Sequence, residues 1–166
     1  MSQVVAGGTQ DWEITLRADV GNVKQANAYA ARLGVDMAVI DKRRLGGDST
    51  VAARVIGSVK GKMVLLFDDM ITTAGTATEA VRILRENGAS GFLLAATHAV
   101  LAGPAVERIR VAGVDQIVVT NTIPVPEAVR KQLPGITVLS VAPMLAEAIK
   151  RIHLNMSVSA LFRSAR

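Results

Sequence analysis

The sequence contains no cysteine, so it has neither a disulfide framework nor a thiolate metal site. Aromatic residues make up only 3% of the chain, which removes the stacking side chains that single-stranded nucleic-acid binders use. No apolar run approaches the roughly 18–20 residues that a membrane span requires, and no signal peptide opens the chain. We therefore expect a cytoplasmic protein with no membrane partner and a core of aliphatic side chains.

The basic residues are numerous but dispersed. The formal net charge of +5 could indicate a polyanionic partner. Yet the cations are spread along the chain apart from residues 42–44 and the C-terminal tail, so we expect no nucleic-acid partner. A length of 166 residues predicts a single domain over 1–166, with irregular segments at 1–12 and 163–166.

Apolar runs alternate with helical patterns along the chain. The patterns predict strands over 12–17, 37–41, 51–56, 91–97, 116–120 and 137–141, and a further strand that begins at Val64. Helices are predicted over 23–33, 77–87 and about 104–111, and from Pro143 to Ile152. This alternation is typical of an α/β fold with a mostly parallel sheet flanked by helices on both faces.

The chain is organised around the stretch from Val64 to Thr76. An apolar strand leads into two adjacent acids, Asp68 and Asp69, which would lie at the carboxyl end of the strand, where open α/β sheets place their ligands. The small, hydroxyl-rich segment 72–76 opens the next helix, and backbone N–H groups there make a cradle for a phosphate. Carboxylates beside a phosphate cradle predict a site for a phosphorylated sugar. The alternative is one helix-capping aspartate with one solvated neighbour.

Several motifs resemble one enzyme family. FDDMITTAGT (67–76) resembles the phosphoribosyl-diphosphate (PRPP) motif of the type I phosphoribosyltransferase fold, which is Rossmann-like. Within that fold the chain resembles ribose-phosphate diphosphokinase, also called PRPP synthetase, from about residue 14 to residue 162. The further similar stretches are AVIDKRR (38–44), THAVLAGPA (97–105), VVTNTIP (118–124) and His153 with SVSALF (157–162).

The resemblance implies a role for each residue of the central motif. Asp68 and Asp69 would hold the ribose 2- and 3-hydroxyls, directly or through Mg²⁺. The 5-phosphate would bind to the loop formed by Thr72, Thr73, Ala74, Gly75 and Thr76. The family usually has an aspartate where this chain has Thr72, and losing that negative charge beside a phosphate should not harm binding.

Three residues outside the motif also match functional positions of the family. Lys42 and Arg44 fall where its catalytic loop supplies cations, and transfer of a phosphoryl-type group requires positive charge delivered by a loop that can close. A solvated basic surface loop is the alternative. Asp19 matches an acid that contributes to metal and ribose binding, although Arg17-Ala18 replaces the family's Ser-Pro. His98 is interpreted as a structural histidine at a strand end.

The chain resembles only the second, C-terminal half of the family enzyme. The other half carries most of the ATP-binding surface, so we expect this chain to bind ribose 5-phosphate or PRPP, and ATP only together with a first-half domain. Whether it is an enzyme alone is left open. The family implies a homo-oligomer. The alternatives are a non-catalytic ribose-phosphate-binding or regulatory module, and a phosphoribosyltransferase that uses PRPP.

Overall fold

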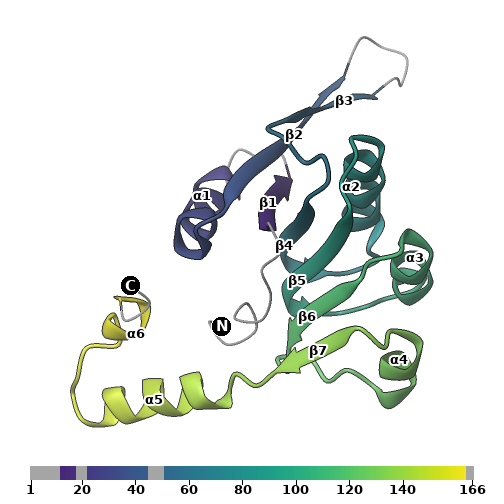
Figure 1. Ribbon diagram of the computed structural model, residues 1–166. Coiled ribbons are helices and arrows are strands. Elements are labelled where there is room, and N and C mark those ends of the chain that lie inside the picture. The colour runs from purple at the N-terminus through teal and green to yellow at the C-terminus, as the bar shows by residue number, and fades with distance from the viewer. Residues whose placement is uncertain (1–11, 18–21, 45–50, 164–166) are drawn as a thin grey trace.

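The fold is built on a single sheet (Figure 1). The structure is a computed structural model that describes residues 12–17, 22–44 and 51–163. In these residues the sheet has seven strands in the order β3-β2-β1-β4-β5-β6-β7, all parallel to their neighbours except for the antiparallel pair β2 and β3. The strands are β1 (Trp12–Arg17), β2 (Asp36–Arg44), β3 (Val51–Ile56), β4 (Met63–Ile71), β5 (Gly91–Ala99), β6 (Gln116–Thr120) and β7 (Ile136–Leu139).

Helices cover both faces of the sheet, which confirms the predicted fold class (Figure 1). Helix α1 (Asn22–Leu33) packs on one face, where Ala26 and Ala30 join Leu65 of β4 in a small apolar cluster. Helices α2 (Gly75–Glu86), α3 (Ala105–Ala112) and α4 (Glu127–Gln132) lie on the other face, over the larger core cluster. Helix α4 was not predicted.

Strand β4 is the buried centre of the sheet. Val64, Leu65 and Leu66 are all less than 7% exposed, because α1 covers one face of the strand and α2 the other. Leu66 and Ile71 belong to the same core cluster although they are five positions apart, an odd spacing that would place them on opposite faces of a regular strand. The strict alternation of a strand is therefore broken between these two residues, where the paired acids lie.

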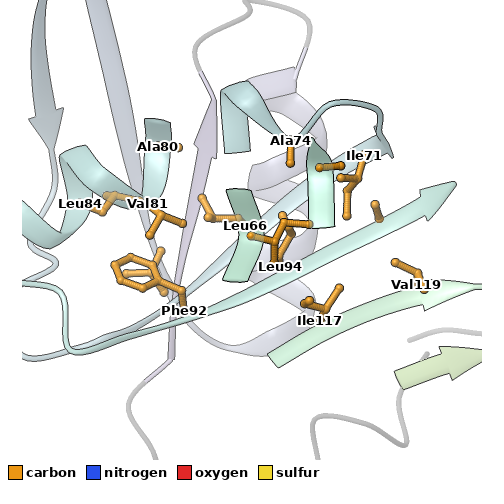
Figure 2. Close-up of a cluster of buried hydrophobic side chains, with 14 of the residues drawn as sticks. Leu66, Ile71, Ala74, Ala80, Val81, Leu84, Phe92, Leu94, Ile117 and Val119 are labelled. Carbon is orange, nitrogen blue, oxygen red and sulfur yellow. The ribbon is translucent and has the colours of Figure 1, made fainter. Parts of the chain in front are cut away.

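Helix α2 is anchored by one apolar stripe. Ala80, Val81, Ile83 and Leu84 are buried in the core cluster that includes residues of β4 and β5. Figure 2 shows Val81 and Leu84 beside Phe92. The helix ends at Glu86 with Asn87 as its cap, and Gly88, with a φ of 91°, then turns the chain toward β5. This packing fixes where the amino end of α2 lies, directly after β4.

The strands β2 and β3 form an arm that projects beyond the rest of the sheet (Figure 1). The sequence predicted that β2 ends at residue 41 and that Lys42 and Arg44 lie in a loop. That boundary was wrong, since β2 continues to Arg44, which pairs with Val51. Charged residues extend the strand there because the antiparallel partner satisfies their backbone groups.

The C-terminal helices contribute little to the core. Helix α5 (Ala142–His153) has no buried residue, and Leu145, Ile149 and Ile152 are more than half exposed. Helix α6 (Ala160–Arg163) is a single turn, so Arg163 is helical where an irregular tail was predicted over 163–166. At the other end, Trp12 belongs to β1, although an irregular segment was predicted over 1–12. Among the helices that the structure describes, none is both long and apolar enough to span a membrane.

Candidate functional site

The paired acids lie near the carboxyl end of β4. Asp68 is half-buried and Asp69 is exposed. The Oδ1 atom of Asp68 accepts a hydrogen bond from the Asp69 backbone N–H at 2.9 Å, and Oδ1 of Asp69 accepts one from the Met70 N–H at 2.8 Å. These local bonds orient both carboxylates at the sheet edge, where a ligand can reach them.

The loop after β4 leads directly into an uncapped helix. Ala74 has φ 58° and ψ 4°, which is the left-handed conformation, and no side chain caps the first turn of α2. Its first N–H groups have no intrahelical partner, because an α-helix satisfies its N–H groups only from the fourth residue on. The chain thus presents backbone donors and the positive end of a helix dipole beside two acids.

Three successive carbonyl groups of this loop are held from the segment that follows β5. Two of the donors are backbone N–H groups and one is a guanidinium. The bonds run from Leu101 N to Ile71 O at 2.9 Å, from Ala102 N to Thr72 O at 2.9 Å, and from Arg108 Nη1 to Thr73 O at 3.1 Å. The loop after β4 and the loop after β5 therefore form one hydrogen-bonded unit.

Threonine and histidine side chains form a hydrogen-bond network at the carboxyl ends of β5 and β6. Thr120 and Thr122 both donate to the Thr97 carbonyl, at 2.7 and 3.0 Å, and Thr122 Oγ1 lies 2.9 Å from His98 Nδ1. Thr120 is only 3% exposed, so its hydroxyl needs these partners. This contact links His98, near the end of β5, to the segment after β6, and the structural role of His98 stays a prediction.

Lys42 and Arg44 lie on β2 beyond the end of the sheet at which Asp68 and Asp69 lie, which we call the acid edge. Because Arg17, the last residue of β1, pairs with Ile40, the residues Lys42 and Arg44 lie two and four positions beyond it, about 7 and 13 Å further along β2. The strand β1 runs parallel to β4 toward the same edge as Asp68. Asp19 lies outside the described residues.

The two acids fit a magnesium site that a bound ligand helps to complete. Among the residues that the structure describes, no group of three or more histidine, cysteine, aspartate or glutamate side chains could hold a metal ion. Mg²⁺ is commonly bound by one or two carboxylates plus substrate phosphates and water. The pair formed by Asp68 and Asp69, with Asp69 exposed before the uncapped start of α2, fits that mode.

Sequence reasoning missed two parts of this site. The link from Arg108 to Thr73 joins residues 35 positions apart, and an isolated arginine on a helix carries no signal of such a bond. The left-handed conformation of Ala74 was also missed, because glycine is the residue that usually marks it.

The sheet order, the two-sided helix cover and the acid pair before an uncapped helix define an α/β protein of phosphoribosyltransferase-like fold. The chain belongs to the family described as the phosphoribosyl synthetase-associated domain, which it matches over residues 49–163. The crystal structure of phosphoribosylpyrophosphate synthetase from Mycobacterium smegmatis is similar, with a TM-score of 0.77 and 43% identity over 88% of this chain and 46% of that one.

Two curated relatives show how much of a whole enzyme the chain represents. It is 48% identical to the ribose-phosphate pyrophosphokinase of Rhodopirellula baltica over 92% of this chain and 48% of the relative. It is 47% identical to that of Synechococcus elongatus, over 90% of this chain and 45% of the relative. The chain thus spans about half the length of the relatives that it matches.

Proposed function

We propose that this chain is the ribose 5-phosphate-binding half of a ribose-phosphate diphosphokinase. The observation that carries the proposal is the amino end of α2, which has no side-chain cap and begins at Gly75, a short loop after Asp68 and Asp69. Uncapped backbone donors favour an anionic phosphate, and two carboxylates favour hydroxyl groups or a divalent cation. Ribose 5-phosphate carries all of these groups within one small molecule.

The proposed binding mode assigns the two ends of the sugar to different elements. Residues 72–76 would bind the 5-phosphate, with Gly75 and Thr76 offering the N–H groups of the first helical turn. Asp68 and Asp69 would bind the ribose 2- and 3-hydroxyls. A charged hydrogen bond of this kind contributes about 1.5–3 kcal/mol, so each acid supports roughly a tenfold or larger change in affinity.

The reaction would then take place on the side of the sheet toward which the β2–β3 arm projects. The C1 hydroxyl oxygen attacks the β-phosphorus of ATP, the bond from that phosphorus to the AMP oxygen breaks, and the hydroxyl proton leaves to solvent. Lys42 and Arg44, which continue β2 beyond the acid edge, would stabilise the charge on the transferred diphosphoryl group. Bound Mg²⁺ would neutralise phosphate oxygens at the acids. Asp19 is proposed as a further metal ligand on the basis of sequence similarity alone.

Several features of the whole enzyme are part of the same proposal. The chain would be the C-terminal half, and ATP would bind only when a first-half domain supplies the rest of its site. In the two curated relatives, the stretch that this chain matches makes up 48% and 45% of the length, so each relative contains a further region that could be such a domain. A homo-oligomer and a cytoplasmic location remain predictions from the sequence.

Isothermal titration in the presence of Mg²⁺ tests the proposal. The chain should bind ribose 5-phosphate, and Asp68→Ala and Asp69→Ala should each weaken that binding about tenfold or more. Asp36→Ala is the matched control, because Asp36 is an exposed acid at the start of β2, whose carboxylate bonds Lys62 at 3.4 Å. If both site variants bind as tightly as the control, the assignment of the acids is wrong.

The described site also fits one second candidate, a non-catalytic ribose-phosphate-binding module, because the acids and the start of α2 would bind the sugar whether or not a transfer follows. The two candidates differ once a first-half domain from a relative is added. Formation of AMP from ATP and ribose 5-phosphate in that mixture, and its loss in Lys42→Gln, supports the half-enzyme. Tight sugar-phosphate binding with no AMP formed in any combination supports the module.

A further inference from the structure

Arg108 of α3 contacts the loop of residues 72–76, although 35 positions separate it from Thr73 in the sequence. Its Nη1 atom donates to the Thr73 carbonyl at 3.1 Å. The same atom lies next to Gly75, since a methyl group placed on Gly75 would lie 3.3 Å from it. The guanidinium therefore lies against the loop at both ends of Ala74.

The Thr73 carbonyl is the one whose direction matters for Ala74. In a trans peptide the C=O and the following N–H point in opposite directions, and the two groups share one plane. Holding the Thr73 oxygen toward α3 directs the Ala74 N–H away from α3 and fixes the plane on which φ of Ala74 depends. The left-handed turn at Ala74 then starts α2 with its first N–H groups in place.

Ala74 needs such support because its conformation is costly. A residue with a β-carbon loses about 1–2 kcal/mol in the left-handed region, and it stays there only when its surroundings hold it. Ala74 is 5% exposed, and its methyl group lies beside Ile71 in the core (Figure 2). Its carbonyl accepts bonds from the Thr78 N–H and hydroxyl, both at 2.9 Å. Arg108 supplies the restraint on the other side.

We propose that Arg108 is a positioning residue for sugar-phosphate binding, which acts by holding the Thr73–Ala74 peptide so that the α2 amino end accepts the phosphate. This inference rests on the proposed function of residues 72–76. Among the described contacts from the β5–α3 segment to the loop carbonyls, Arg108 provides the side-chain donor, while Leu101 and Ala102 act through backbone N–H groups. It is thus the contact that a substitution can remove.

The chain offers a matched control two residues further along α3. Arg110 is also exposed, but its guanidinium bonds Glu107 of the same helix at 2.8 and 3.0 Å. That hydrogen bond and the nearby charge raise the pKa of Arg110. Arg110→Gln removes the same charge and a bond of similar length from the same helix without removing a contact to the loop.

The experiment uses the full chain and three variants, Arg108→Gln, Arg108→Lys and Arg110→Gln. The first measurement is the backbone NMR chemical shifts of Ala74 without ligand, here called the Ala74 signals, which report the left-handed conformation. The second is the dissociation constant for ribose 5-phosphate with Mg²⁺. We expect Arg108→Gln to move the Ala74 signals toward the values of a loop that averages over several backbone conformations. We also expect it to weaken ribose 5-phosphate binding about tenfold, the size of one charged hydrogen bond. Arg110→Gln should change neither.

The lysine variant separates position from charge. Lysine keeps the positive charge but lacks the planar fork of arginine. Affinity restored to the wild-type value while the Ala74 signals remain shifted would show that only charge matters and would overturn the proposal. Unchanged Ala74 signals in Arg108→Gln would overturn it as well. If the wild-type chain does not bind ribose 5-phosphate, the proposed function fails, and the Ala74 signals still decide whether Arg108 holds the loop.

Discussion

Replacing Ala74 by glycine tests whether the loop of residues 72–76 is held in a strained conformation. Ala74 and Ala80 are both buried alanines of the same core cluster, each 5% exposed. They differ in backbone conformation, since Ala74 has φ 58° while Ala80 lies inside α2. Ala80→Gly is therefore a control that removes the same methyl group from the same cluster.

The two substitutions should differ in their effect on the free energy of unfolding. At Ala80, loss of the methyl group costs about 0.8 kcal/mol, and glycine in a helix interior costs about 1 kcal/mol more. At Ala74 the methyl costs the same, and the freer unfolded chain adds about 0.4–1 kcal/mol. Relief of the left-handed strain returns about 1–2 kcal/mol. Ala80→Gly should thus destabilise by about 2 kcal/mol, and Ala74→Gly by less than about 1.

Equilibrium unfolding in urea, followed by far-ultraviolet circular dichroism, measures both free energies. The wild-type chain and the two variants should show the same dependence on denaturant concentration, so that the midpoints compare directly. If Ala74→Gly destabilises the chain as much as Ala80→Gly does, Ala74 is not strained. The reasoning about how the loop is held would then be refuted.

Other contacts give further expectations. Arg85 donates to the carbonyls of Ala112 and Gly113 at the end of α3, so Arg85→Gln should lower the free energy of unfolding by about 1 kcal/mol, measured in urea. Ile149→Lys should leave that free energy unchanged and raise solubility, because Ile149 is 68% exposed on α5. The hydrogen bond from Arg110 lowers the pKa of Glu107, so this pair stabilises the fold above the ordinary glutamate pKa and loses its effect as the pH falls through the lowered value. Arg110→Gln should raise the Glu107 pKa toward its ordinary value in an NMR titration.

Strand positions were predictable where the apolar pattern is strong. The strands over 12–17, 51–56 and 116–120 have the predicted bounds, since their residues alternate or form buried runs. The helix α4 was missed because two prolines, Pro124 and Pro126, stand just before it, and proline commonly interrupts regular structure. Pro126 has an extended ψ of 149° and immediately precedes the helix, a position that proline tolerates. The end of β2 was missed because its charged residues depend on pairing with β3, which no local pattern reveals.

In the candidate site, too, some parts could be predicted from the sequence and others could not. The acid pair and the helix start after it are adjacent in sequence, so their position at the end of a strand could be predicted. The hydrogen bonds that hold the loop come from residues 101–108, and they depend on how α3 packs against α2. Local sequence carries no record of that packing, and neither the Thr97–Thr120 contact nor the Arg108 contact was predicted.

The hydrogen bonds between the two loops also bear on protein engineering. An exchange of residues 68–76 with a related enzyme would transfer the acids and the helix start but leave behind the donors on which the loop conformation depends. Residues 101–108 would have to be exchanged with them. Under the proposed function, the smallest portable sugar-phosphate module in this fold is thus discontinuous in sequence, and grafts that treat the motif as one linear segment should lose its geometry.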